Sequence, residues 1–397
     1  MVVACGGYGY WYLRTLFDEV APGKYRLAGV VDPLIRQLPI FPELEQGKIP
    51  VYEHLEDFYR EQSADLAVIS SPIHHHVPQT LLALRNHSRV LCDKPLGVTV
   101  QEAHELIRER ARLNGWVSIG YQWTFSRAIR SLKKDILQGR FGKPLRFKSL
   151  ALWPRDQGYY LRNNWAGRIR SEGGQWILDS PANNAMAHDL HNMLYLLGPD
   201  MDTSATPASV IAEAYKVYPI GNFDTVNARI STTEGTELLF YASHATEKPV
   251  NPMFRIDCED AYITFSDKTK NIIAVRKKGK EKHYGSPNHD HQFKKLFHAI
   301  KAVHTNGPMI CSPEAAAAQT LCVNGIQDSL RDSIPFPSRL IRRNELKLYI
   351  NGLGGMFQQC YHKNVLLHEL VPGWTVAGKN ISLKEYIFFP GGKEKKK

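Results

Sequence analysis

A short glycine-rich segment near the start of the chain has the composition of a phosphate-binding turn. Ala4-Cys5-Gly6-Gly7-Tyr8-Gly9 aligns with G-x-G-x-x-G if Ala4 replaces the first glycine. In this register Gly6 stands where backbone must approach a pyrophosphate, and Gly9 stands where a helix packs closely on a strand. The other register would put the bulky Tyr12 at the third glycine, so we favour the first. Backbone N–H groups at the start of the following helix would then bind the anion.

An aspartate follows this turn at the distance expected for a nucleotide site. Asp32 ends the next apolar strand, about 20 residues on, where a carboxylate can accept hydrogen bonds from a ribose 2′-hydroxyl. Its charge would repel a 2′-phosphate, so we expect NAD; Arg36 nearby keeps NADP possible. Without Asp32, the glycine turn would fit equally well a structural connection with no ligand.

Lys94 stands where an acid–base group would be useful. It follows the apolar segment Arg89–Cys92 and precedes Pro95. At the carboxyl end of a central strand it would lie beside the crevice of a nicotinamide, and partial burial would lower the pKa of its ammonium toward the working range. Such a lysine can exchange a proton with a substrate hydroxyl while a hydride leaves the carbon. The alternative is an exposed lysine in a turn.

Several motifs in combination resemble the Gfo/Idh/MocA oxidoreductase family. They are Ser71-Pro72-Ile73-His74-His75-His76, Cys92-Asp93-Lys94-Pro95, and the series Gly173-Gly174, Asp179, His188 and Leu196-Leu197-Gly198. The family has T-P-N-x-x-H, E-K-P, and a glycine pair followed by Asp, His and L-L-G. The resemblance runs from residue 1 to about the helix around 315–329. It implies an NAD(P)-dependent oxidoreductase with a Rossmann domain, in which His76 caps or packs near the cofactor.

The family's acid, four positions before its histidine, is not uniquely placed in this chain. Counting back from His188 leads to Asn184, whereas counting forward from Gly174 leads to Asp179. An asparagine there could orient a substrate but could not act as a base. His188 is the best candidate proton shuttle, because imidazole titrates near neutrality. His191 stands where a later acid often follows in the family; for both histidines the alternative is a helix-face residue bonded to a backbone carbonyl.

These arguments define a candidate site. We expect catalysis by Lys94, His188, Asp179 and Asn184. We expect cofactor binding by Gly6, Gly7, Tyr8, Gly9, Asp32, Ser71, Pro72, His76, Asp93, Lys94, Pro95 and Gln122. Substrate binding is expected from Lys94, Arg155, Tyr159, Asn164, Trp165, Asn184, His188 and His191.

The substrate expectation rests on the loop from Trp153 to Trp165. Its flat aromatic faces and many hydrogen-bonding groups suit a pyranose, glycoside or cyclitol. Trp153 and Trp165 could instead be core or interface anchors. Arg155, Arg162 or Arg168 could select a carboxylated or phosphorylated sugar, since a guanidinium matches those anions.

The elements that must position these residues predict an α/β fold of two domains. Short apolar strands alternate with amphipathic helices up to residue 121, which predicts a Rossmann domain with a doubly wound parallel sheet. Residues 122–337 predict an α+β domain for substrate and oligomerisation, with an open, mostly antiparallel sheet. Residues 338–397 form a C-terminal extension of uncertain structure, and its Gly-rich segment 351–355 suggests an added lobe or tail.

Composition excludes several other classes. The chain has 397 residues and a net charge of +11, much of it in Arg276–Lys282 and Lys393–Lys397, which lack the aromatic platform of a nucleic-acid site. No apolar stretch reaches the roughly 20 residues of a membrane span, and no signal peptide is recognised, so we expect a soluble cytoplasmic protein. Six cysteines without C-x-x-C pairing favour reduced, buried thiols.

Metal chemistry and covalent hydrolysis are not favoured either. His74, His75 and His76 are consecutive, so their side chains diverge, and His289-Asp290-His291 has no further ligand at zinc-like spacing. We therefore expect no metal. No glycine-serine elbow is present.

Three functional classes remain open. The first is a dehydrogenase that transfers a hydride between a hydroxyl-bearing carbon of a sugar, glycoside or cyclitol and the nicotinamide. The second is a lyase or hydrolase of the same fold that uses tightly bound NAD in transient oxidation. The third is a non-catalytic NAD-binding regulator, against which Lys94 and His188 speak. We expect a small carbohydrate substrate, no nucleic acid or membrane partner, and a homo-oligomer (dimer or tetramer) formed through the open sheet.

Overall fold

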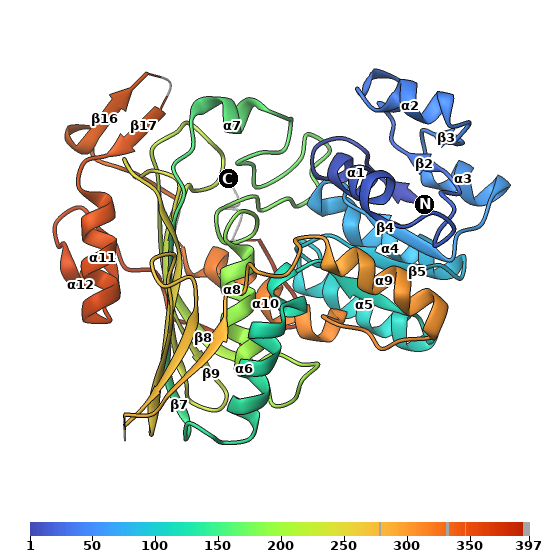
Figure 1. The fold of residues 1–397 in the computed structure, drawn as a ribbon. Helices are drawn as coiled ribbons and strands as arrows, with labels where there is room; N and C mark the ends of the chain where they lie inside the picture. The colour runs from blue at the N-terminus through green and yellow to red at the C-terminus, as the bar shows by residue number, and fades with distance from the viewer. Residues whose placement is uncertain (278, 331–332, 346, 392–397) are drawn as a thin grey trace.

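The computed structural model describes residues 1–391 apart from 278, 331, 332 and 346; the basic run 393–397 lies outside these residues. Two sheets organise the chain (Figure 1). The N-terminal domain holds a six-stranded sheet, and the second domain is built on a ten-stranded sheet seen almost edge-on. The predicted α/β domain followed by an α+β domain is confirmed.

The first sheet is parallel, with the order β3-β2-β1-β4-β5-β6 that characterises dinucleotide-binding folds. Its strands are β1 (Val2–Val3), β2 (Val30–Val31), β3 (Val51–Tyr52), β4 (Leu66–Ile69), β5 (Arg89–Cys92) and β6 (Val117–Ile119). The predicted strand over 25–31 keeps only its last two residues, and β3 was not predicted. In this order the carboxyl ends of β1, β4 and β5 meet at one edge of the sheet.

Helices cover both faces of this sheet. They are α1 (Tyr8–Glu19), α2 (Phe41–Gln46), α3 (Leu55–Glu61), α4 (His76–Arg85) and α5 (Val100–Arg112), with short 3-10 turns at η1 (Ile35–Gln37) and η2 (Ile73–His75). Helix α5 begins with a capping box, because Thr99 accepts from the Glu102 amide and Glu102 accepts from the Thr99 amide. Later in the chain, α9 (Lys294–Thr305) returns to this domain, where Phe293, Leu296 and Ala299 join the core around α1.

The second sheet is mixed and mostly antiparallel, in the order β14-β13-β12-β11-β7-β10-β9-β8-β15, with β18 also on β8. Among the described strands of this second sheet, only β7 with β10 and β8 with β15 pair in parallel. The strands are β7 (Pro144–Leu152), β8 (Pro207–Lys216), β9 (Thr225–Thr232), β10 (Glu237–Ser243), β11 (Val250–Cys258), β12 (Ala261–Phe265), β13 (Ile272–Arg276), β14 (Glu281–Gly285), β15 (Ile334–Pro335) and β18 (Ile381–Ser382). Arg276 ends β13, and Glu281 and Lys282 begin β14.

The inner face of this sheet carries the helices that approach the N-terminal domain. These are α6 (Arg127–Leu137), α8 (Ala187–Leu196) and α10 (Pro313–Ser329), which lie between the sheet and the first domain in Figure 1. Alternate sheet residues such as Val226, Ala228 and Ile230 pack against them in one buried core. Because α8 also faces the first domain, its residues can reach the ends of β4 and β5.

The outer face of the sheet is covered by the C-terminal extension. After η4 (Ser338–Leu340) the chain forms β16 (Ile341–Asn344), β17 (Lys347–Ile350), α11 (Leu353–Lys363) and α12 (Leu367–Leu370), drawn in red in Figure 1. Leu353, Phe357 and Cys360 are fully buried against the sheet residues Leu150 and Tyr241. The mostly antiparallel sheet is as expected, and the described residues of the extension cover part of its outer face.

The last described residues return to the first domain. After β18 the segment reaches Phe389, whose amide donates to Gln101 Oε1 at 3.0 Å and whose carbonyl accepts from Gln101 Nε2 at 3.4 Å. The Phe389 ring packs with Ile73 and Val98 of the first domain and Leu178 of the second. This C-terminal segment thus links the two domains.

Two expectations about environment can be compared with the structure. All six cysteines are buried and unpaired, as expected. None of the helices among the described residues is long and apolar enough to cross a membrane.

Candidate active site

The glycine turn between β1 and α1 has the register that the sequence favoured. Ala4, at the first glycine position, has a positive φ of 62°. A Cβ on Gly9 would lie 1.7 Å from the Ala4 carbonyl oxygen, so only glycine fits at this contact between strand and helix. The fully buried Tyr12 belongs to the α1 core rather than to the turn. Both ends of the fingerprint therefore have the geometry that the motif requires.

The N-terminus of α1 is open to an anion. Its N-cap is Gly7, at φ 53°, and no side chain caps the helix or places a negative charge in its first turn. A Cβ on Gly7 would have no atom within 4 Å, so the space in front of the turn is free. Uncapped amides and the positive end of the helix dipole together favour a phosphate group.

Asp32 lies against the same turn. Its Oδ2 accepts from the amides of Cys5 at 2.8 Å and Gly6 at 3.4 Å, and its Oδ1 accepts from Leu34 at 2.8 Å. The carboxylate therefore both fixes the turn and places a negative charge beside it. A carboxylate offers about four lone-pair positions, so these bonds leave capacity for a ribose hydroxyl.

The ends of β4 and β5 are held together by His76. One ring nitrogen, Nδ1, lies 2.6 Å from the Pro95 carbonyl oxygen, and the other, Nε2, lies 2.8 Å from that of Ser71. The ring is buried, and Ser71 itself donates to Gln79. His76 thus packs where the family resemblance implied, and it fixes the position of the loop that carries Lys94.

Lys94 meets the second domain directly. Its Nζ donates to the Asn184 carbonyl oxygen at 2.9 Å and to Asn184 Oδ1 at 3.0 Å. The Asn184 Nδ2 donates to Asp179 Oδ1 at 2.9 Å, and the other Asp179 oxygen accepts from the Gly167 amide at 2.6 Å. Asn184 therefore contacts Lys94 directly. Asp179 contacts Asn184 and fixes the orientation of its amide.

The protonation of this chain of contacts follows from burial. Desolvation lowers the pKa of Lys94, which the nearby Asp93 partly opposes. Desolvation also raises the pKa of Asp179, against the hydrogen bond from Gly167. Both shifts favour the neutral forms, so at a given pH more of Lys94 than of an exposed lysine is in the neutral form that can accept a proton.

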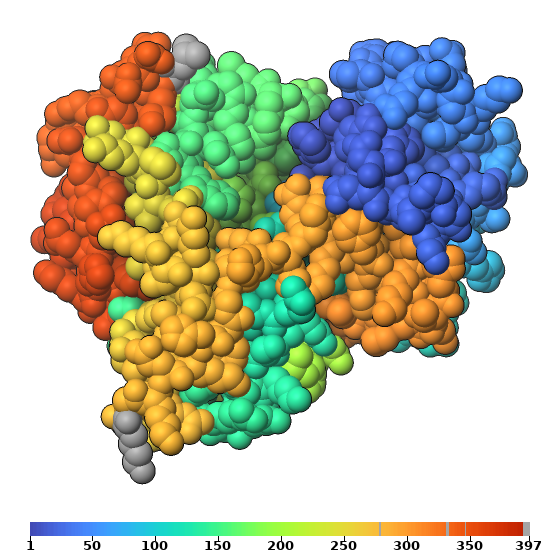
Figure 2. Space-filling model, viewed as in Figure 1, coloured from blue at the N-terminus to red at the C-terminus, as the bar shows by residue number. Residues whose placement is uncertain are grey.

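His188 borders a cavity of about 310 Å³ in the second domain. The cavity is lined by Gln122, Trp123, Trp153, His188, Asp189, Asn251, Pro252, Phe265, Asp267 and Asn288. Gln122 begins the turn η3 (Gln122–Phe125) that leaves the first domain. Figure 2 shows the surface hollowed between the blue N-terminal domain and the green and yellow segments of the second.

The expectation that His188 titrates near neutrality is wrong. Burial, followed by the positive charge of Lys94, holds its pKa well below the ordinary value of imidazole. Its Nδ1 is buried and has no hydrogen-bond partner among the described residues. His188 is therefore a neutral imidazole with an unused polar atom, suited to hydrogen-bond a ligand.

His191 does not face the same space. Its ring is stacked on Tyr121 with centroids 3.9 Å apart, and its Nε2 lies 3.0 Å from Thr124 Oγ1 and 3.6 Å from Cys311 Sγ. It is 1% exposed, and burial lowers its pKa to about 3. These contacts are those of a core residue, so we leave His191 out of the proposed substrate site.

Different parts of the loop from Trp153 to Trp165 lie in different surroundings. It contains α7 (Gln157–Leu161), and Arg162 lies over the Tyr159 ring at 3.6 Å. The charges of Asp179 and Arg162 both act on the Tyr159 hydroxyl, whose pKa burial raises, so this part of the loop lies near the Lys94 site. Trp165 packs against the interdomain core that contains Phe389, as in the anchor alternative, and Asn164 is exposed.

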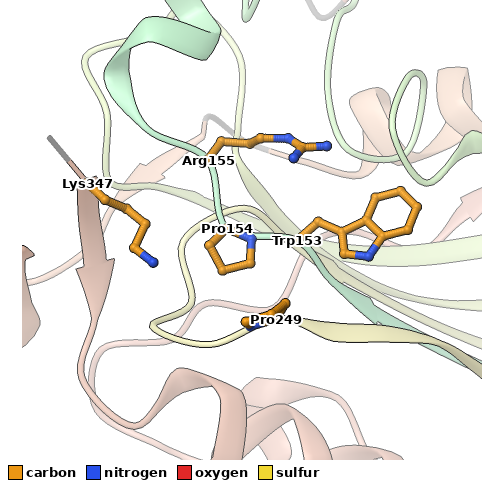
Figure 3. A pocket seen from close by; sticks show the side chains of 5 residues that line it. All are labelled: Trp153, Pro154, Arg155, Pro249 and Lys347. Carbon is orange, nitrogen blue, oxygen red and sulfur yellow. The ribbon is translucent and has the colours of Figure 1, made fainter. Parts of the chain in front are cut away.

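Arg155 lies on the other side of this loop. With Trp153, Pro154, Pro249 and Lys347 it lines an open cavity of about 470 Å³ next to the extension. Figure 3 shows Lys347 approaching from β17 on one side, with Arg155 and Trp153 on the other. The structure therefore does not bring Arg155 together with Lys94 and His188 in one cavity.

Two residues near the site were missed from the sequence. Lys295, fully buried in α9, donates to Asp93 Oδ1 and to the Gly120 carbonyl oxygen, each at 3.1 Å. Burial opposes its charge, but Asp93 and Tyr8 more than offset this, so the pKa of Lys295 is raised. Asp189 is the second missed residue. For Lys295 alone the sequence offers a signal, because its charge stands on an otherwise apolar helix face, next to Phe293 and Leu296.

No group of three or more His, Cys, Asp or Glu side chains within the described part of the chain is placed to hold a metal ion. The residues present do fit a dinucleotide. Gly6, Gly7 and Tyr8 would hold its pyrophosphate and Asp32 a ribose, while Ser71, Pro72 and Lys94 stand at the edge where its nicotinamide end would lie.

The turn and the strand order are those of a dinucleotide-binding domain. Residues 1–121 match the Gfo/Idh/MocA family model, described as an oxidoreductase family with an NAD-binding Rossmann fold. The resemblance seen in the sequence is therefore confirmed for these residues.

Relatives and solved structures agree with this assignment. The chain is 28% identical over 204 residues to scyllo-inositol 2-dehydrogenase (NAD(+)) of Bacillus subtilis, covering 50% of this chain and 54% of that protein. It is 29% identical over 202 residues to inositol 2-dehydrogenase of Rubrobacter xylanophilus, covering 51% and 52%. The chain thus spans about half the length of these relatives.

The fold of both domains has solved counterparts. The WlbA dehydrogenase of Bordetella pertussis, solved with NADH and UDP-GlcNAcA, matches with a TM-score of 0.66 over 85% of this chain and 98% of that one. At 16% identity this similarity shows the fold alone.

Proposed function

We propose that this protein is an NAD-dependent dehydrogenase that oxidises a hydroxyl-bearing carbon of a sugar, glycoside or cyclitol, or reduces the corresponding ketone. The observation that carries the proposal is the contact of Lys94 with Asn184 beside the unpartnered imidazole of His188. The named relatives act on inositols, which are polyols of this class.

The lysine is oriented for proton transfer. In the neutral amine, both N–H groups of Lys94 are used by the two oxygens of Asn184, so its lone pair is left for a substrate hydroxyl. As the hydroxyl is oxidised, its proton moves to Lys94 Nζ, and the resulting ammonium keeps both bonds to Asn184. When bound, the nicotinamide supplies the hydride acceptor.

The other residues position these groups. Asp179 holds Asn184 so that Oδ1, and not Nδ2, faces Lys94. The neutral His188 can donate to or accept from the reacting oxygen without a change of charge. Asp32 favours NAD over NADP, because its carboxylate lies at the turn where a 2′-phosphate would be repelled.

The test is an assay of the purified full chain with a panel of sugars and cyclitols, after a check for cofactor that co-purifies. Added NAD should accumulate as NADH with at least one polyol, and Lys94→Met should remove this activity. Turnover without net change of the cofactor would instead indicate the lyase or hydrolase chemistry. Oxidation of a simple hydroxy acid, but of no polyol, would contradict the proposed substrate class.

A further inference from the structure

One buried carboxyl group in the cavity that His188 lines has no role in the steps above. Asp189 follows His188 in the first turn of α8, lines the same cavity of about 310 Å³ and is 4% exposed. The hydrogen bond to its carboxylate comes from its own backbone amide, and no other residue of the described chain donates one. A buried carboxyl group with so little support is costly in a folded protein, so it calls for an explanation.

Comparison with the other buried carboxylates shows how unusual this is. Asp179 and Asp224 are held by backbone amides, and Asp93 and Asp135 are bonded to lysines. Asp32 accepts from amides, and Glu213 accepts from Tyr215 and His368. Asp189 has only the hydrogen bond of its own backbone amide in the described structure, and burial raises its pKa to about 7. Within the described structure, the carboxyl group lines a cavity that is large enough for a ligand.

The side chains that line the cavity indicate which kind of ligand group would bind there. Asp267 and Asn288 supply acceptor oxygens in addition to those of Asp189. Trp123, Trp153 and Phe265 supply flat apolar walls. None of the described residues that line the cavity is a lysine or an arginine. Such a site attracts a group that donates hydrogen bonds and repels an anion.

We propose that Asp189 is a specificity-determining residue, which binds a hydroxyl or amine group of the substrate in this cavity and disfavours substrates with a carboxylate or phosphate there. The inference rests on the proposed function, since His188 lines the cavity and lies close enough to Lys94 for the charge of the lysine to act on its imidazole. It separates two substrate classes that the sequence left open, because the arginines of the 153–165 loop had allowed an acidic sugar.

The experiment compares wild type with Asp189→Asn and Asp189→Leu, using D-glucose, myo-inositol, D-glucosamine and D-glucuronate as probes with NAD. Asp57→Asn is the control, because it removes the same charge from the first turn of a helix outside the cavity. For each probe that wild type oxidises, Asp189→Leu should raise KM about 10- to 150-fold, the value of a hydrogen bond to a charged group. kcat and NAD affinity should change much less.

Asp189→Asn keeps the shape and can still hydrogen-bond, so it separates charge from packing. It should retain the neutral probes, reduce the ratio of kcat/KM for glucosamine over glucose, and bind glucuronate more tightly as a competitive inhibitor. An unchanged ratio with unchanged glucuronate inhibition would overturn the inference, even if Asp189→Leu fails to fold. Unchanged KM values in Asp189→Leu would overturn it while the proposed function stands. If wild type oxidises no polyol, the proposed function fails, and the inference fails with it.

Discussion

Replacing Lys94 by methionine removes the atom on which the proposed mechanism depends while nearly preserving the length of the side chain. The change deletes the bonds of 2.9 and 3.0 Å to Asn184; its carbonyl oxygen keeps the Ala187 amide at 3.3 Å, whereas its Oδ1 loses the donor from Lys94. An acceptor that loses its donor costs about 1–3 kcal/mol, but removing a desolvated amine offsets part of this, so the protein should remain folded. Loss of the proton acceptor should lower kcat by about 10²–10⁴, or about 2.7–5.4 kcal/mol of transition-state stabilisation.

The assay is the initial rate of NADH formation with an accepted polyol, together with the dissociation constant of NAD for each variant. Lys295→Met is the matched control, because this second buried lysine is bonded to Asp93 and Gly120 rather than to Asn184. It should change stability more than the chemical step. A Lys94→Met protein with near wild-type kcat would refute the mechanism.

The same lysine predicts a pH dependence of the reaction. Oxidation should become faster as pH rises, because the neutral amine is the active form of Lys94. The rate should reach its plateau below the ordinary titration range of lysine, since burial lowers the pKa of this group. A rate that continues to rise up to that ordinary range would show that Lys94 is not desolvated as described.

Five further changes test other parts of the structure. Asp32→Ala should weaken NAD binding relative to NADP, and equal affinity ratios in variant and wild type, measured by fluorescence titration, would argue against the ribose assignment. Gly9→Val should abolish cofactor binding, since even a Cβ would lie 1.7 Å from a backbone oxygen, and normal affinity would contradict the turn geometry. His188→Asn should lower kcat without moving the pH profile, because the neutral imidazole does not titrate in this range; a shifted profile would assign the titration to it. Phe357→Glu should detach α11 and expose the apolar sheet residues beneath it, so the variant should self-associate more than wild type in sedimentation runs; a variant that sediments like wild type would count against this packing. The pKa of His191 is about 3 in the folded protein against 6.5 in the unfolded chain, so its contribution to stability is lost as pH falls from 6.5 toward 3. His191→Gln should therefore flatten the fall of Tm in that window. An unchanged Tm profile would count against the lowered pKa of His191.

Local patterns predicted the parts of the site that local structure places. The ends of β1, β4 and β5 could be located from apolar runs followed by Gly6, Ser71 and Lys94, because parallel strands bring their carboxyl ends to one edge. The strand β3 (Val51–Tyr52) is too short for any periodicity to reveal it. Spacing along the chain was thus sufficient wherever one strand end or one helix start fixed a residue.

Contacts between distant segments could not be predicted in this way. The bond from Lys94 to Asn184 joins residues 90 positions apart, and the alignment alone left Asn184 and Asp179 as alternatives. The burial of His188, and hence its low pKa, depends on how α8 meets the first domain.

The extension shows the limit of propensity as a guide. Its glycines suggested an added lobe or tail, and Gly354 and Gly355 lie inside α11. Burial of Leu353, Phe357 and Cys360 against the sheet stabilises a helix that its own sequence does not favour.

The pairing of Phe389 with Gln101 bears on how ligands enter and leave. A hinge movement that separated the two domains on this side would have to break both hydrogen bonds and expose a ring that is 2% accessible. We therefore expect the C-terminal segment to restrict the separation of the two domains, which occurs on the slow timescale of domain motions. A substitution at Gln101, far from the reacting atoms, should then act on the rate at which product and cofactor depart and leave the hydride-transfer step itself unchanged.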